Sequence, residues 1–288
     1  MTVAPPNYEV IALKYATRAG ARPDHFVGGD PHDVPAPMDY YLWVIRNADR
    51  MVLVDTGFNQ DMATKRHRTL LRRPVEALAL LGIAPDAVRD IVITHLHNDH
   101  IGTFDEYPNA RFHLQDNEMA FATGRYMCCE RFNRAYEIEH VAGVVRLTYQ
   151  DRIEFHQGDA EIAPGISVHR IGGHTAGLQA VRVHTARGWV VLASDASHYY
   201  EHFEKRRCFP LVFHVGDALE GYARLLALAE SPQHVIPGHD PLVAVRYPAH
   251  APGLEGIAFR LDAEPFAAPE VAVVKAASNG GKRRRYDP

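Results

Sequence analysis

Short apolar runs separated by turn residues dominate the pattern of hydrophobic positions along this chain. Runs rich in Val, Ile, Leu and Tyr predict early β-strands at 8–14, 40–46 and 51–54, with a hairpin-like turn at 47–50. Later strands are predicted at 91–94, 112–114, 167–171, 180–184, 189–193 and 235–236. Residues 146–149 are expected to start another strand, and residues 161–165 are expected to form a turn.

Two segments carry the end signals of helices. Pro74–Leu81 has proline at its first position and is closed by Gly82. In Asp217–Ala229, Asp217 and Glu220 have the spacing of a capping box ahead of an apolar stripe. A short helix is predicted at 85–89 and irregular helical structure at 116–148. Strands, a helix-rich middle, and then strands and a helix again predict a layered α/β sandwich.

Composition places the chain among ordinary globular proteins. Its 288 residues suit one large domain or two small ones, and we expect a single domain over 1–275 followed by a disordered basic tail, 276–288. A net charge of −4 gives no reason to expect nucleic acid. Three cysteines, two of them adjacent, do not look like a disulfide framework, and a cytoplasmic location is the simplest interpretation. Neither a signal peptide nor a membrane-spanning run is expected.

Four residues of metal-ligand type, three histidines and an aspartate, crowd into the segment Thr94–His100, which follows the apolar run 91–93. His95, His97, Asp99 and His100 offer imidazole and carboxylate, the ligands that zinc, manganese and iron prefer when no thiolate is present. The loop at the carboxyl end of a strand is where α/β proteins usually place chemistry. The alternative is a polar loop that happens to hold three histidines.

The pattern His-x-His-x-Asp-His after a strand resembles the signature of the metallo-β-lactamase superfamily of hydrolases. Other motifs of that family occur in order, each near a strand-like run: Asp55-Thr56-Gly57, Gly172–Gly177, Ser194–Ala196 and Pro237–Asp240. The resemblance extends over about residues 40–245. It implies an α/β fold, the four-layer αβ/βα sandwich of the metallo-β-lactamase type, with metals at one edge of two mixed sheets.

The resemblance also implies a ligand set for two divalent metal ions. One ion would be held by His95, His97 and His174, the other by Asp99, His100 and His239, and Asp195 would bridge them. Zinc (Zn2+) is the default, and Mn2+, Fe2+ or Co2+ also suit nitrogen and oxygen ligands. Such a pair makes hydroxide available at neutral pH, so hydrolysis needs no protein nucleophile.

Within the superfamily, the chain most resembles N-acyl-homoserine lactone lactonases, because position 195 holds aspartate and the last motif ends in His239-Asp240. The implied activity is quorum quenching: hydrolytic opening of a lactone ring in a small-molecule substrate. Alternatives are a thioesterase of the glyoxalase II type, another ester or lactone hydrolase, or an inactive metal-binding protein. A homodimer is compatible with the resemblance.

The proton donor to the leaving alkoxide departs from the family pattern. Lactonases of this group tend to carry tyrosine three residues after the bridging aspartate, where this chain has His198, followed by Tyr199. Either residue could serve as the donor, or the substrate is not an acyl-homoserine lactone. Tyr199 is slightly favoured, because a phenol stays protonated at pH 7. Aromatic residues at 199–216 and 121–134 either wall a pocket or fill the core.

Overall fold

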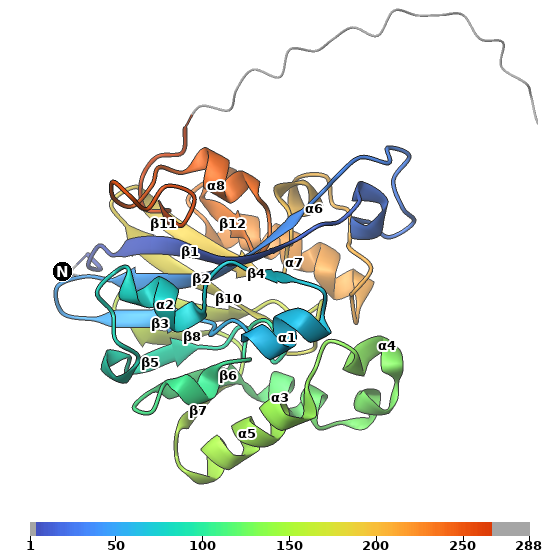
Figure 1. Cartoon of the computed structure of the whole chain (residues 1–288), viewed down its shortest axis with the longest axis horizontal. Helices are drawn as coiled ribbons and strands as arrows, with labels where there is room; N and C mark the ends of the chain where they lie inside the picture. Colours follow the sequence, from blue (N-terminus) through green and yellow to red (C-terminus); the bar gives the residue numbers. More distant parts are fainter. Residues whose placement is uncertain (1–3, 267–288) are drawn as a thin grey trace, which may run out of the picture.

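Two β-sheets stacked face to face form the centre of the computed structural model, which describes residues 4–266 (Figure 1). The first sheet has the order β13-β1-β2-β3-β5-β6-β7, and β4 (Thr69–Leu70) pairs with β1. Its other strands are β1 (Glu9–Arg18), β2 (Met38–Arg46), β3 (Met51–Val54), β5 (Asp90–Val92), β6 (Arg111–Gln115), β7 (Ile153–His156) and β13 (Ala258–Arg260). Strands β3, β5, β6 and β7 are parallel to one another, and the remaining pairs are antiparallel.

The second sheet has the order β12-β11-β10-β9-β8. Its strands are β8 (Ala160–Ala163), β9 (Ile166–Arg170), β10 (Gln179–Thr185), β11 (Gly188–Ser194) and β12 (Val235–Pro237). Only the β11–β12 pair of this sheet is parallel. Both sheets are therefore mixed, as the sequence resemblance implies.

The burial of β2 shows why the sheets form the inner layers. Eight of its nine residues are buried, because helices cover one face and the second sheet covers the other. Tyr41 and Trp43 belong to the core between the sheets, whereas Tyr40 and Leu42 belong to the core beneath the helices. The alternation follows the two-residue period of a strand. This arrangement confirms the predicted four-layer sandwich.

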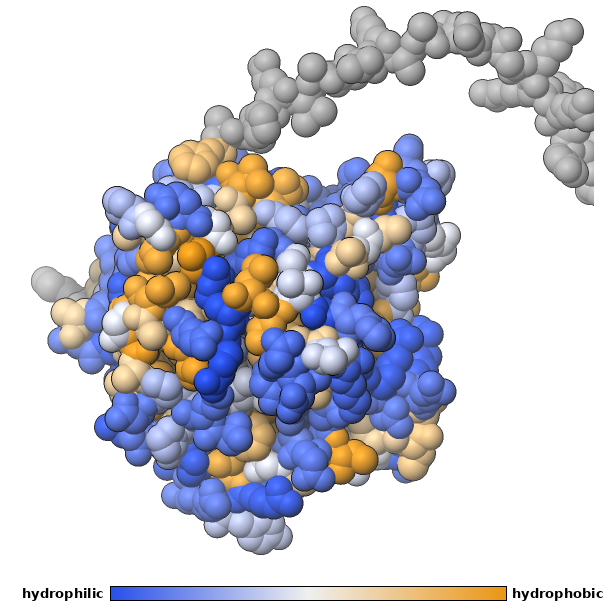
Figure 2. Space-filling view, in the orientation of Figure 1, coloured by the Kyte–Doolittle hydropathy of each residue, from blue (hydrophilic) through white to orange (hydrophobic). Residues whose placement is uncertain are grey.

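Helices cover the outer faces of the two sheets. The helices against the first sheet are α1 (Gln60–Lys65), α2 (Pro74–Ala79), α3 (Asp116–Ala122), α4 (Glu130–Asn133) and α5 (Ile138–Tyr149). Those against the second are α6 (Tyr200–Glu204), α7 (Val215–Leu228) and α8 (Leu242–Arg246). In Figure 2, the part of the visible face over α1 and α4 is mostly hydrophilic. Within residues 4–266 we find no helix with the length and apolar character needed to cross a membrane.

Most predicted elements are present, but the strand expected to start at 146–149 is wrong. These residues are the last turn of α5, and the strand begins later, at Ile153. Val144 and Leu147 are both buried three residues apart, so the helical period continues through this segment. The turn predicted at 161–165 is also wrong for its first three residues, which extend β8 and pair with β9.

The helix predicted at 217–229 begins two residues earlier, and its cap differs from the prediction. The side chain of His214 accepts a hydrogen bond from the Asp217 N–H at 3.1 Å, so His214 is the N-cap. The capping box expected from Asp217 and Glu220 is not formed at these positions. Residues 267–275 of the predicted domain and the predicted basic tail at 276–288 lie outside the described residues.

Candidate metal centre

The predicted ligand motifs meet at the ends of strands from both sheets. The loop 93–100 follows β5, residue 195 follows β11 and residue 239 follows β12, whereas residue 174 lies in the turn between β9 and β10. The hydroxyl of Thr94 lies 2.8 Å from the hydroxyl of Ser194, so loops of the two sheets touch at this point. The fold therefore brings residues almost 150 positions apart in the sequence into one cluster.

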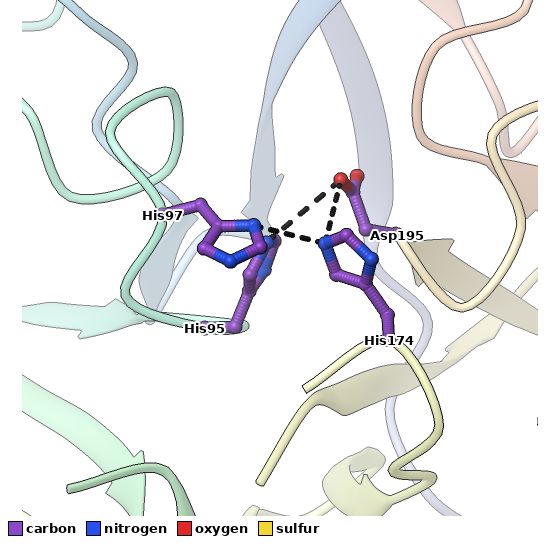
Figure 3. Close-up of side chains that lie close together, drawn as sticks. All are labelled: His95, His97, His174 and Asp195. Carbon is purple, nitrogen blue, oxygen red and sulfur yellow. Dashed lines mark hydrogen bonds and ion pairs between the residues drawn. The ribbon is translucent and has the colours of Figure 1, made fainter. Parts of the chain in front are cut away.

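Four buried side chains form the first ligand group, and Figure 3 shows them converging from three separate loops. His174 Nε2 lies 2.9 Å from His97 Nδ1 and 3.4 Å from Asp195 Oδ2. His95 Nε2 lies 3.8 Å from the same carboxylate oxygen. Three imidazole nitrogens and one carboxylate oxygen facing one another are a donor set that suits a divalent ion.

A second group lies on the other side of Asp195. Asp99, His100 and His239 are all buried and can direct one ligand atom each to a common point. His239 Nε2 lies 2.9 Å and His100 Nε2 lies 3.4 Å from Asp195 Oδ1. Because Oδ2 faces the first group and Oδ1 the second, Asp195 stands between two candidate ion positions. The structure thus brings together all seven residues that the sequence singled out as ligands.

Unsatisfied polar atoms at the centre of the cluster test whether cations fit here. His95 Nε2, His100 Nε2 and Asp195 Oδ1 are buried, and although ligand atoms lie near them, none is oriented to form a hydrogen bond with them among residues 4–266. Buried polar atoms without partners are rare in folded proteins, because leaving them unsatisfied costs free energy. All three point toward the other ligand atoms, so bound cations would satisfy them, and the residues fit a pair of divalent ions.

The electrostatics of the cluster favour, for His95 and Asp195, the protonation states that metal ligands need. Burial lowers the pKa of His95 well below its usual value, and the imidazoles of His100 and His97 lower it further. Burial alone would raise the pKa of Asp195, but neighbouring imidazoles, His239 first, outweigh burial and hold that pKa well below its usual value. A neutral imidazole and an ionised carboxylate are both competent to bind a cation.

Asp55 orients one of these ligands from behind. It accepts hydrogen bonds from the Thr94 N–H at 2.8 Å and from His100 Nδ1 at 2.7 Å, which leaves His100 Nε2 to face the site. Burial lowers the pKa of His100, but the carboxylates of Asp195, Asp55 and Asp99 outweigh burial and raise it well above its usual value. Binding of a cation at His100 would therefore release a proton.

Comparison with known proteins identifies the family of this chain. The family profile described as the Metallo-beta-lactamase superfamily matches residues 37–239, which is more than half of the sequence. The chain belongs to the metallo-beta-lactamase superfamily. The match begins just ahead of β2 and ends at the last predicted ligand, His239, so it includes every ligand motif described above.

Curated relatives of this superfamily member include enzymes named as lactonases. N-acyl homoserine lactonase AiiB of Agrobacterium fabrum is 29% identical over 182 residues, which are 57% of this chain and 64% of that protein. N-acyl homoserine lactonase of Bacillus thuringiensis is 30% identical over 179 residues, 57% of this chain and 66% of that protein. The matched segments thus cover less than two thirds of these relatives.

Solved structures share the fold of this superfamily member. A structure described as a quorum-quenching N-acyl homoserine lactone lactonase superposes with a TM-score of 0.69, at 22% identity, over 84% of this chain and 95% of that one. At this identity the likeness establishes the fold, which agrees with the two mixed sheets and outer helices seen here.

Glu118 is a functional-site residue that the sequence motifs did not reveal. It is fully buried at the third position of α3 and accepts hydrogen bonds from the Leu96 N–H, the Thr175 hydroxyl and the Gly177 N–H, at 3.0, 2.5 and 3.1 Å. Gly177 must be glycine here, because a Cβ would lie 2.0 Å from the Glu118 nitrogen. The Glu118 carboxylate thus joins the loop that carries His95 and His97 to the turn that carries His174.

A cavity of about 410 Å³ opens above the ligands. Its lining includes the candidate ligands His97, Asp99, Asp195 and His239, together with Met38, Tyr40, His198, Phe209 and Leu211.

Of the aromatic residues predicted at 199–216 either to wall a pocket or to fill the core, Phe209 lines this cavity and Phe203 is buried in the core. Each interpretation therefore holds for part of the segment. Phe121 lies 4.6 Å from Phe213, ring centre to ring centre, which favours the core interpretation at 121–134.

The two residues predicted as proton donors lie in different places. His198 lines the cavity, stacks on Phe209 at 3.6 Å between ring centres, and places Nε2 3.1 Å from Asp195 Oδ2. The hydroxyl of Tyr199 instead donates to the carbonyls of Ala36 and Pro37, at 3.3 and 3.0 Å, and this residue is not part of the cavity lining. The structure brings His198, but not Tyr199, to the ligands.

Tyr40 is a residue of the cavity lining that the sequence did not single out. The ring centre of Tyr40 lies 4.9 Å from the ring centre of His239. Tyr40 is on the face of β2 that packs toward the helices. Burial raises the pKa of Tyr40 to about 12, so its hydroxyl stays protonated at neutral pH. The only available signal was the alternation of β2, which places Tyr40 on the same face as Leu42.

Proposed function

We propose that this chain is a dinuclear metal hydrolase that opens the ring of a lactone, with N-acyl-homoserine lactones as the first candidates. The observation that carries the proposal is the convergence of seven ligands on two adjacent points at the floor of a 410 Å³ cavity. The curated relatives named N-acyl homoserine lactonases support the choice of a lactone.

One ion would be held by His95, His97 and His174. The other ion would be held by Asp99, His100 and His239, and Asp195 would contact both ions. When bound, such a pair supplies Lewis acidity toward a carbonyl oxygen and makes hydroxide available near neutral pH. Zinc is the metal we propose, because zinc accepts the mixed nitrogen and oxygen donors that these ligands offer. From the lactonase assignment we also propose that the enzyme quenches quorum signals and forms a homodimer. The cysteine pattern, which does not look like a disulfide framework, supports the proposal that it acts in the cytoplasm.

Ring opening adds water across the acyl–oxygen bond: the hydroxyl joins the carbonyl carbon, and the ring oxygen leaves with a proton. The chain's own contribution is to orient the lactone and to deliver that proton. His198 and Tyr40 are the cavity groups placed to do so, His198 through Nε2 beside Asp195 and Tyr40 through its hydroxyl. Phe209 and Leu211 offer apolar contacts that exclude water from the reacting carbonyl.

A turnover panel with metal analysis tests the proposal. Short- and long-chain N-acyl-homoserine lactones, γ-butyrolactone and S-lactoylglutathione would be followed in a pH-indicator assay with metal-loaded protein. We expect ring opening by the parent protein and its loss in His239→Ala, with the exposed His32→Ala as a control that keeps its activity. Turnover of the thioester alone would assign the protein to the glyoxalase II type. No turnover of any substrate by fully loaded protein would contradict the hydrolase assignment.

A further inference from the structure

Four arginines line the same cavity as the metal ligands. They come from separate elements: the last residue of β1, the end of α1, the segment before β4, and the end of α4, namely Arg18, Arg66, Arg68 and Arg134. Figure 1 shows α1 and α4 on one side of the molecule, and Figure 2 shows the surface over them to be mostly hydrophilic. No catalytic step proposed above uses this positive charge.

Two of the four arginines have acidic partners within the protein. Arg68 lies 3.4 Å from Asp99 Oδ2 and extends over the ring of Tyr40, so it orients a predicted metal ligand. Arg66 forms an ion pair with Glu137. These two guanidinium groups therefore have structural roles that do not need a substrate.

The other two arginines have no such partner. Among residues 4–266, neither Arg18 nor Arg134 forms an ion pair with a carboxylate. Among the described residues, the Arg18 side chain makes one hydrogen bond, to the sulfur of Met38 at 2.9 Å, and its Nε is buried without a hydrogen-bond partner. Apart from the two aspartate ligands, Asp24 is the one acidic residue among those that line the cavity, and it is exposed. Arg18 is half-buried and Arg134 is exposed, so the cavity wall carries two positive charges that no ion pair within residues 4–266 neutralises.

Such a wall is unusual for a pocket that binds a neutral molecule. Small-molecule pockets are mostly apolar with a few placed polar groups, and a buried polar atom without a partner, such as the Arg18 Nε, costs free energy. The planar guanidinium group, by contrast, matches the paired oxygens of a carboxylate or phosphate and binds them through two charge-assisted hydrogen bonds. The chemistry of the wall therefore points to an anion.

We propose that the substrate is a lactone that carries an anionic oxygen group, a carboxylate or a phosphate monoester, held by Arg18 and Arg134 while the ring lies over the metal ligands. The inference rests on the proposed lactonase function and narrows its substrate class. N-acyl-homoserine lactones lack such a group and would be weaker substrates.

Matched pairs of lactones test this directly. The first pair is 5-oxotetrahydrofuran-2-carboxylate and its uncharged primary amide; the second is the phosphate ester of 5-(hydroxymethyl)-γ-butyrolactone and the free alcohol. We expect kcat/KM to be roughly 10–100-fold higher for the anionic member of at least one pair, the gain typical of hydrogen bonds to a charged group. Which pair shows the gain distinguishes carboxylate from phosphate.

Arginine variants locate the effect within the cavity. In Arg18→Gln and Arg134→Gln, the ratio of kcat/KM between the anionic and neutral members should fall toward one. Arg89→Gln is the matched control, because this exposed arginine precedes β5, at the opposite end of the strand from the ligands. A ratio unchanged in Arg18→Gln and Arg134→Gln would overturn the assignment of the anion to these two residues.

The failure of this inference can be told apart from the failure of the proposed function. If the protein opens both members of each pair equally well, the anionic subsite is overturned and the lactonase stands. If it opens no lactone, the lactonase fails, and calorimetric binding of the ring-opened product 2-hydroxyglutarate then decides the subsite. Binding that weakens in Arg18→Gln but not in Arg89→Gln supports an anion site, and binding that is absent or unaffected overturns it.

Discussion

Glu118 accepts a 2.5 Å hydrogen bond from the hydroxyl of Thr175, the residue that follows the predicted ligand His174. The same carboxylate accepts the N–H of Leu96, between the predicted ligands His95 and His97. Metal centres depend on such outer contacts, because they fix where each ligand points. Glu118 therefore sets the distance between the two loops that supply the first ion.

Replacing Glu118 by Gln should weaken metal binding. The amide would turn an NH2 group toward donors that now face a carboxylate oxygen, so one or more buried N–H or O–H groups would lose their acceptor. We expect a ~10–100-fold loss of metal affinity, as is typical for an outer-contact residue. Competition with a chromogenic chelator measures it. Glu139→Gln, at an exposed site on α5, is the control, and equal affinity in both variants would contradict this role for Glu118.

Each predicted ion should depend on its own ligands. His97→Ala removes a nitrogen from the first group and His239→Ala one from the second, so each variant should lose at least one ion and most of the activity. Elemental analysis of protein purified without chelator gives the metal content, for which we expect two ions in the parent. A parent protein that is active with one ion or none would contradict the dinuclear assignment.

The clustering of the seven candidate ligands could be predicted from the sequence because metal binding restricts residue type and spacing at once. His95, His97 and Asp99 follow an apolar run, and three such side chains so close together do not suit an ordinary surface or core segment. The strand at 51–54 was predicted to the residue, because its apolar run is bounded by turn residues. Elements and residue clusters that have one dominant local cause could thus be predicted from the sequence.

Features that depend on long-range packing could not be predicted in this way. Glu118 has no motif around it, and its role appears only when α3 is placed against two distant loops. The strand β13 at 258–260 is short and is specified by pairing with β1 rather than by its own sequence. Whether Tyr40 or Tyr199 lies near the site also depends on which backbone segments pack around the cavity. Spacing along the chain does not reveal this packing.

Asp195→Asn should damage catalysis more than folding. The carboxylate faces His239 at 2.9 Å and His100 at 3.4 Å, and as the proposed bridge it offsets the repulsion between two cations. The amide keeps the shape of the side chain but not its charge. We expect a soluble protein with the parental circular dichroism, reduced metal content and little turnover. Near-normal turnover with both ions retained would remove Asp195 from the bridging position.

The ion pair between Arg22 and Glu201 should make stability depend on pH in acid. Two hydrogen bonds of 2.7 Å join these side chains, and they lower the pKa of Glu201 from 4.5 to about 2. Because the folded state has the lower pKa, the contribution of this carboxylate is fully present above pH 4.5 and is lost as the pH falls toward 2. The difference in Tm between the parent and Glu201→Gln should therefore be constant near neutral pH and shrink below pH 4.5. A difference that grows in acid would contradict the sign.

The identity of the proton donor gives the most demanding prediction. Expulsion of an alkoxide requires a proton, and His198 is the sequence-predicted donor that lines the cavity. His198→Ala should lower kcat by the ~10²–10⁴-fold typical of general acid catalysis. Because His198 Nε2 also lies 3.1 Å from Asp195, metal content must be measured in the same samples.

Tyr199→Phe and Tyr40→Phe distinguish the two phenols from His198 as the proton donor. The Tyr199 hydroxyl is bonded to the carbonyls of Ala36 and Pro37, so its removal should change kcat less than removal of the His198 imidazole. Tyr40 lines the cavity and its hydroxyl stays protonated at neutral pH, so a large loss in Tyr40→Phe with His198→Ala near the parental rate would move the donor to β2. A large loss confined to Tyr199→Phe would require the segment that carries Ala36 and Pro37 to move during turnover. If all three variants open lactones at the parental rate with both ions bound, no protein group donates this proton, and the second ion alone stabilises the leaving oxygen.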